Sequence, residues 1–239
     1  MLLCVFHCAC GIALAEAQSK PDLSGYWGPG RAGQVDQARV AQLPPNTVVL
    51  SDAGAAEFPA GEYGGLKVKQ AAIEAAKRWK PTDDMTPSRA CMPPSIVYTM
   101  QGPFPMEIFQ GTEFIIIKLE YFDLVRIVFM NQTSHPADVP HRKVGHSIGR
   151  WEGSTLVVDT TQIAESTITN NGLNHSDKVR VVERFWLSND GKTLNSLQEF
   201  EDPEVLENRG ARFMAWDKVA GQHVLPYECD PSFAAEYLK

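Results

Sequence analysis

The stretch GHSIGRWEGSTLVVDTT, residues 145–161, has the pattern of two β-strands joined by a tight turn. Gly153 and Ser154 supply the turn, and apolar and polar side chains alternate after it. A small polar pair between two such runs is typical of a β-hairpin, in which we expect Trp151 to pack beside the turn. The stretch therefore predicts antiparallel β structure.

Similar β-branched and aromatic runs follow one another from residue 105 onward, with short turns between them. The turns are too short for crossover connections, so neighbouring strands should be antiparallel, and about eight strands are expected. A sheet of this size hides its edges by curling or closing. We therefore predict a mainly β fold for residues 105–239, an antiparallel, lipocalin-like barrel or strongly curled sheet.

The preceding part of the chain, residues 18–104, is rich in Pro and Gly and reads as an arm on this body. Within it, DLSGYW at 22–27 predicts a short strand anchored by its aromatic residues. One helix is expected at 66–80, with Pro81 ending it. With 239 residues, of which 44% are hydrophobic and 21% charged, the chain has the composition of a single globular domain.

Residues 1–17 read as an export signal, because they are apolar and end in the small residues that a cleavage site requires. This segment is too short to span a membrane, and no later run reaches the roughly 18–20 apolar residues that a span needs. The sequence thus predicts a periplasmic or secreted protein. Removal of the signal leaves Cys91 and Cys229, which we expect to form one disulfide, with a catalytic thiol as the disfavoured alternative.

The net charge of −7 argues against a nucleic-acid partner, because phosphate binding needs a clustered basic surface and no basic run is present. The expected partner is instead a small hydrophobic or aromatic molecule, since small barrels often hold one ligand. The sequence carries no signal for an oligomeric state.

Several ionisable residues lie in the middle of apolar strands. The alternation at 179–187 places Glu183 on the same face as Val181 and Phe185, which should point inward. Glu107, Arg126 and Asp159 have similar settings. Burial of an unpaired charge costs several kcal/mol, so these groups should form structural ion pairs, face solvent or line a polar cavity.

The histidines provide candidates for acid/base chemistry. His146 and His175 each precede a serine at the start of a strand, and could stand at the mouth of a barrel. Glu183 and Asp159 would orient them, while Arg126, Tyr121 and Glu107 would bind the substrate. His135 and His141 lie near His146, but the spacing matches no metal motif, so neither a metal nor another cofactor is expected. Ser147 in GHSIG has the spacing of a hydrolase elbow, but a strand rather than a helix follows it.

Three motifs, PFPMEIFQ, GHSIGRWEGSTLVVDT and NHSDKVRVVERF, resemble a family of exported bacterial proteins to which no common activity is assigned. Its members carry PYPMEIVQ, GHSVGRWEGDTLVVDT and PHSEALHVVERF in the same order. The match covers roughly residues 87–202 and implies a shared architecture. Ser154 departs from the acidic turn residue of that family, and the loop before His175 also differs. The resemblance maps onto these positions: Glu107, His146, Arg150, Trp151, Glu152, Asp159, His175, Glu183 and Arg184.

Three functions stay open at this point. The leading hypothesis is a cofactor-independent lyase, isomerase or dehydratase with His146 and His175 as its acid/base pair. A non-catalytic, lipocalin-like carrier of an apolar ligand is the second, and an envelope interaction protein is the third. An enzyme predicts a polar cavity beside a histidine of perturbed pKa, a carrier predicts an apolar cavity, and an interaction protein predicts a filled barrel with an exposed apolar patch.

Overall fold

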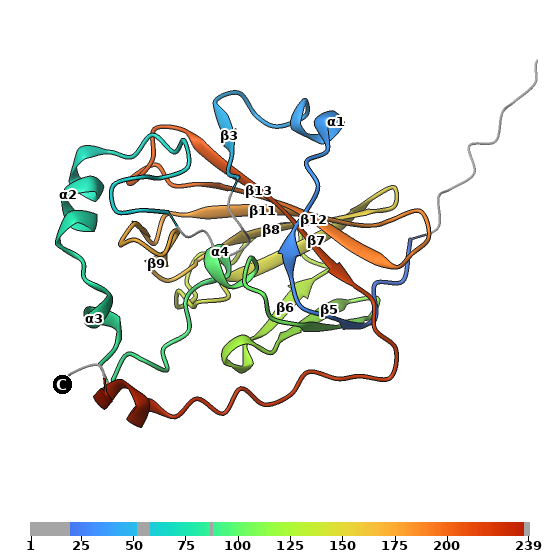
Figure 1. Ribbon diagram of the computed structural model, residues 1–239. Coiled ribbons are helices and arrows are strands. Elements are labelled where there is room, and N and C mark those ends of the chain that lie inside the picture. Colours follow the sequence, from blue (N-terminus) through green and yellow to red (C-terminus); the bar gives the residue numbers. More distant parts are fainter. Residues whose placement is uncertain (1–19, 52–57, 87, 237–239) are drawn as a thin grey trace, which may run out of the picture.

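The computed structural model describes residues 20–51, 58–86 and 88–236 (Figure 1). The expected export signal at 1–17 lies outside these residues. The strands are β1 (Gly25–Trp27), β2 (Arg31–Ala32), β3 (Thr47–Val49), β4 (Met106–Gln110), β5 (Phe114–Leu119), β6 (Val125–Phe129), β7 (His146–Glu152), β8 (Thr155–Thr161), β9 (Ser166–Thr167), β10 (Asn174–His175), β11 (Arg180–Leu187), β12 (Thr193–Glu201) and β13 (Arg209–Asp217). The helices are α1 (Gln37–Val40), α2 (Gln70–Arg78), α3 (Pro81–Asp84), α4 (Ile96–Thr99), η1 (Tyr121–Asp123) and η2 (Pro231–Glu236).

One large curled sheet dominates the described residues. Its path is β1-β4-β5-β6-β7-β8-β11-β12-β13-β2, and β3 joins it beside β13. Pairing is antiparallel except between β6 and β7 and between β13 and β3. The prediction of a mainly β, strongly curled antiparallel fold is confirmed, in the form of a half-barrel. The sheet has eleven strands rather than about eight, because three short strands of the N-terminal arm pair with it.

The predicted hairpin is formed by β7 and β8, with Gly153 at a φ of 59° in the turn. This left-handed conformation suits glycine because it has no Cβ. Trp151 packs against the core, while Arg150 and Glu152 form an exposed ion pair. The GRWEG segment at 149–153 therefore has a structural explanation at its turn.

The N-terminal arm joins the two edges of the curl. β1 pairs with β4, and Trp27 also forms an isolated bridge with Lys218 just beyond β13. Gly28 N–H donates to Asp217 O at 2.8 Å, and Val219 N–H donates to Tyr26 O at 3.1 Å. Trp27 is completely buried, so the predicted aromatic anchor is present. The arm is part of the sheet rather than an appendage to it.

The helix expected at 66–80 is shorter than predicted. Val68 forms a β-bridge with Leu206, and Lys69 N–H donates to Val205 O at 2.9 Å, so the backbone is extended until Gln70. The helix α2 then ends at Arg78, before Pro81, as the proline signal indicated. Pro81 itself begins α3, because proline is well accommodated in a first helical turn.

The short helix α4 lies at the inner, concave face of the sheet (Figure 1). Ile96, Val97 and Met100 are each at most 1% exposed. Gln198 donates to Ile96 O at 3.1 Å, and Arg212 donates to Val97 O at 2.8 Å. Apolar packing and these hydrogen bonds hold α4 against β12 and β13, in the region where the sequence predicted a ligand cavity.

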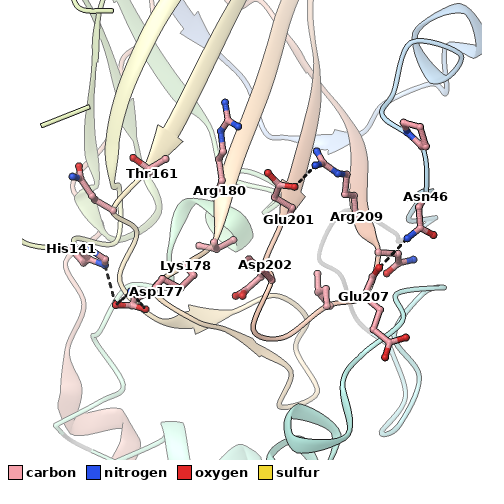
Figure 2. A pocket seen from close by; sticks show the side chains of 16 residues that line it. Asn46, His141, Thr161, Asp177, Lys178, Arg180, Glu201, Asp202, Glu207 and Arg209 are labelled. Carbon is pink, nitrogen blue, oxygen red and sulfur yellow. Dashed lines mark hydrogen bonds and ion pairs between the residues drawn. The ribbon is translucent and has the colours of Figure 1, made fainter. Parts of the chain in front are cut away.

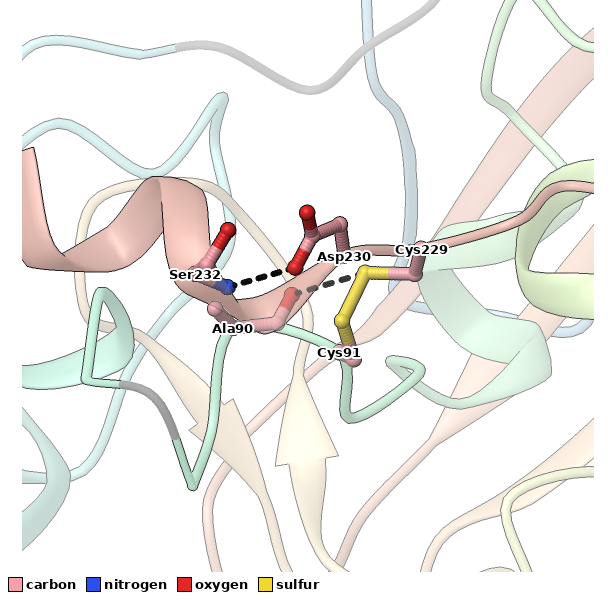
Figure 3. The surroundings of a disulfide bond; sticks show 5 residues. All are labelled: Ala90, Cys91, Cys229, Asp230 and Ser232. Atoms are coloured by element: carbon pink, nitrogen blue, oxygen red, sulfur yellow. Dashed lines mark hydrogen bonds between the residues drawn. A yellow bond between two sulfur atoms is a disulfide. The ribbon is translucent and has the colours of Figure 1, made fainter.

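The predicted disulfide between Cys91 and Cys229 is present, across a sequence separation of 138 residues (Figure 3). It fastens the C-terminal segment, just before η2, to the loop that follows α3. Figure 1 shows this segment crossing from the end of β13 to the side where α3 lies. Among the described helices, none has the length and apolarity to cross a membrane.

Candidate functional site

The inner face contains a fully buried ion pair. Arg126 Nη2 lies 2.5 Å from Glu183 Oε2, and the two side chains are 1% and 0% exposed. Arg126 also donates to Ser147 Oγ at 2.9 Å and to Thr160 Oγ1 at 2.7 Å. Gln198 Nε2 reaches Glu183 Oε1 at 3.4 Å. The alternation correctly placed Glu183 inward, and its partner is Arg126 rather than a histidine.

His175 belongs to a separate buried network. Its Nε2 lies 2.7 Å from Ser95 Oγ, and its Nδ1 lies 2.8 Å from Ser176 O. Because a carbonyl oxygen only accepts, Nδ1 carries the proton and Nε2 accepts from Ser95. Burial lowers the pKa of His175 to about 4, against a smaller opposing effect of its hydrogen bond to Ser176. At neutral pH this ring is neutral and both of its nitrogens are occupied.

Glu107 and Tyr121 belong neither to the Arg126–Glu183 pair nor to the His175 network. Glu107 is buried and sits 2.6 Å from Nδ1 of the exposed His223. Tyr121 stacks on Phe104 with ring centroids 4.2 Å apart, and burial raises the pKa of its hydroxyl. The residues expected to bind substrate thus occupy separate contacts and do not converge on one cavity.

A different group comes together on the outer face of β7, β8 and β11. His146 Nδ1 lies 2.8 Å from His135 Nδ1, and His135 Nε2 lies 3.8 Å from Asp159 Oδ1. Asp159 also receives two hydrogen bonds from Arg180, at 2.9 and 2.5 Å. His146 stacks on Phe129, with centroids 5.0 Å apart and 15° between the ring planes. Two expected site residues, His146 and Asp159, therefore meet through His135.

The charge of Asp159 favours one arrangement of protons in the two imidazoles. At 3.8 Å, Asp159 makes no hydrogen bond to His135 Nε2, but its negative charge faces that nitrogen and favours a proton on it. In a neutral ring this leaves His135 Nδ1 as an acceptor, so His146 must donate through its own Nδ1. The lone pair of His146 then resides on Nε2. This nitrogen has no hydrogen-bond partner within the described part of the chain, and can act as a base.

Both imidazoles are held in their neutral forms. Burial lowers the pKa of His146, and the neighbouring His135 lowers it further. Burial also lowers the pKa of His135, and although Asp159 opposes this effect, Arg180 adds to it. The Asp159 hydrogen bond raises the pKa of Arg180, which remains charged. A deprotonated His146 at neutral pH is the state that general-base chemistry requires.

A pocket of about 680 Å³ with many charged side chains in its lining adjoins this group (Figure 2). Two of its lining residues connect it to this group: Thr161 is the strand partner of His146, and Arg180 binds Asp159. In its lining, His141 lies 3.7 Å from Asp177, and Arg209 forms an ion pair with Glu201. The pocket therefore suits the polar part of a small molecule.

An apolar patch continues from the other side of His146 across the outer face of β4, β5 and β6. Phe129 pairs with Phe114 across β6 and β5, with ring centroids 5.5 Å apart. The exposed apolar side chains of this patch are Phe109, Phe114, Val125 and Ile127.

Comparison with known proteins supplies no relative. No protein-family model, curated protein or solved structure matches the chain.

Sequence reasoning did not include His135 and Arg180 in the site. A signal existed for His135, because three histidines fall within twelve residues, but only the folded loop brings its ring onto His146. Arg180 lies on the face opposite Val181 and next to Asp159 on the adjacent strand, a relation that strand pairing decides. Among the described residues, no group of three or more His, Cys, Asp or Glu side chains could hold a metal ion.

Proposed function

We propose that the protein is a cofactor-independent acid/base enzyme of the lyase, isomerase or dehydratase type, with His146 as its base. The observation that carries this proposal is the chain of contacts Asp159–His135–His146, which leaves the lone pair of His146 on Nε2. An imidazole oriented by a second group and kept neutral is the usual form of a protein general base.

Each residue of the chain has a distinct role in this proposal. His146 Nε2 removes a proton from the substrate and later returns it, while its Nδ1–H stays bonded to His135. His135 and Asp159 are positioning residues: they fix the tautomer of His146 and stabilise the positive charge that it acquires. Phe129 fixes the plane of the His146 ring by stacking on it.

The substrate would be a small molecule with an apolar or aromatic part and a polar part. Phe129 and Phe114 offer apolar contact on one side of His146, and the pocket at Thr161 and Arg180 offers polar contact on the other. The reaction site is thus proposed on the outer face, because α4 and the Arg126–Glu183 pair occupy the inner one. In this proposal His135, and not His175, is the partner of His146.

The tautomers can be tested without a substrate. In two-bond ¹H–¹⁵N correlation spectra of the full chain at pH 7.5, His146 should show a proton on Nδ1 and His135 a proton on Nε2. Asp159→Asn should change this preference, because the amide does not attract the His135 proton as a carboxylate does. A proton on His146 Nε2 in the unmodified protein would refute the proposal.

The chemistry can be tested by deuterium incorporation. The protein is incubated in D₂O with a panel of small aromatic hydroxy acids and keto acids, and uptake is followed by mass spectrometry. His146→Gln should lower the rate for any active compound by about 10²- to 10⁴-fold, the usual contribution of a general base. Asp159→Asn should lower it less and shift its pH profile. The exposed His223→Gln is the matched control, and an equal rate for His146→Gln would contradict the assignment.

A further inference from the structure

A second pocket, of about 490 Å³, lies between the loop at 58–63, the end of α2 and the loop at 170–171. Its character differs from that of the charged pocket at Thr161, because three aromatic side chains line it. The lining residues on which the argument depends are Phe58, Ala60, Tyr63, Lys77, Trp79 and Asn171.

Hydrogen bonds hold two walls of this pocket together. The Asn171 side chain, which is 7% exposed, donates to Pro59 O at 3.0 Å and to Glu62 O at 2.7 Å. It also accepts from Thr169 Oγ1 at 2.6 Å. A buried amide that is satisfied on both ends fixes the 58–63 loop against the 169–171 loop, so these walls exist without a ligand.

The third wall is equally constrained. Trp79 Nε1 donates to Asp84 Oδ2 at 2.7 Å, which fixes the indole ring. Gly172 has a φ of +91°, and a Cβ at this position would lie 2.8 Å from Trp79 Cβ. Only a residue without a side chain allows the loop to approach Trp79 this closely. The aromatic wall is therefore preformed.

Lys77 is the one charged side chain among the residues that line this pocket. Its ammonium group lies 3.0 Å from Glu74, which does not line the pocket, and both side chains are about half exposed. Exposed ion pairs of this kind contribute little, so an anionic ligand can compete with Glu74 for Lys77. The volume and the mainly apolar lining are those of small-molecule sites.

We infer that this pocket binds a small aromatic compound with a negatively charged group, whose ring packs among Phe58, Tyr63 and Trp79 and whose charge lies near Lys77. The site is distinct from the proposed acid/base site on β7 and β8. It matches the class of partner expected from the sequence, but at a place outside the inner face of the sheet.

Two fluorescent probes test the inference on the full chain, the anionic 1-anilinonaphthalene-8-sulfonate and the neutral N-phenyl-1-naphthylamine. Both should bind at one site. Ala60→Trp, at an exposed position of the lining, should weaken both by at least about tenfold because the new ring fills the pocket. Lys77→Met should weaken the anionic probe about threefold to tenfold and leave the neutral probe unchanged, in line with a partly exposed charge pair.

Ile127→Lys, in the outer-face apolar patch, is the matched control and should change neither affinity. Circular dichroism of each variant checks that the fold is retained. The inference is overturned if the anionic probe does not bind, if Ala60→Trp leaves binding unchanged, or if Ile127→Lys removes it. Equal weakening of both probes by Lys77→Met would overturn the requirement for a negative charge.

Discussion

At the scale of single residues, the surroundings of a histidine decide what its ring can do. His175 and His146 have the same sequence setting, each before a serine at a strand. In the structure, both nitrogens of His175 are engaged and the ring is 1% exposed, whereas His146 is engaged through Nδ1. His175 therefore suits a structural role, and its titration should appear as a dependence of the free energy of unfolding on pH.

The first prediction concerns the dependence of stability on pH. The pKa of His175 is lowered from 6.5 to about 4 in the folded protein, so the unfolded chain takes up the proton first. The stabilising contribution is complete above pH 6.5 and is lost as the pH falls from 6.5 to 4, by about 3 kcal/mol. Urea unfolding between pH 7.5 and 4 measures this loss. His175→Gln should remove this part of the loss, and an unchanged profile in that variant would contradict the assignment.

At the scale of elements, the polar residues of the inner face link strands that are not neighbours. Arg126 on β6 reaches across β7 and β8 to Glu183 on β11. Both groups are desolvated, so the pair contributes less than its short distance suggests, and the larger cost follows when one partner is removed. Ser147 and Thr160, on the intervening strands, donate or accept within the same network.

The second prediction follows from this asymmetry. Glu183→Gln should lower the free energy of unfolding by about 3–5 kcal/mol, because it leaves the Arg126 guanidinium buried without a counter-charge. The double variant Arg126→Met with Glu183→Leu should recover much of this loss. Urea unfolding of Arg126→Met, of Glu183→Leu and of the double variant completes the cycle. Additive losses in the double variant would show that the two side chains do not act as a pair.

At the scale of the whole molecule, both ends of the described chain are attached to the body that the curled sheet forms. The N-terminal arm pairs with β4 and β13, and the C-terminal segment is tied by Cys91–Cys229. Between β13 and this disulfide, the C-terminal segment also forms a hydrogen bond next to η1, where Leu225 N–H donates to Glu120 Oε2 at 3.0 Å. The disulfide closes a long loop and restricts the unfolded chain accordingly.

The third prediction is that reduction of this disulfide destabilises the fold without abolishing it. Loss of a cross-link over so long a loop should cost about 2–4 kcal/mol. Thermal unfolding with and without a reductant measures the change. Cys91→Ser and Cys229→Ser should each reproduce the effect of reduction, and the double variant should be insensitive to the reductant. Equal stability of the reduced and oxidised protein would refute this prediction.

Much of the architecture was predictable because strand periodicity is a local property. The alternation at 179–187 correctly placed Glu183 beside Val181 and Phe185, and the Gly153-Ser154 turn correctly joined two strands. The pairing of the only two cysteines after the expected signal was also confirmed. The helix at 66–80 was too long, because Val68 pairs with a residue far along the chain.

The sequence by itself determined the β class, the faces of the strands and the disulfide, since these follow from side-chain alternation, turn residues and residue count. Only the tertiary structure decided which side chains pack on the inner face of the curled sheet and which residues make up the candidate site. Arg126 finds Glu183, and His135 finds His146, through loops and strand order that bring together residues 57 and 11 positions apart. Which neutral imidazole carries a free lone pair depends on such contacts, and no local pattern encodes them.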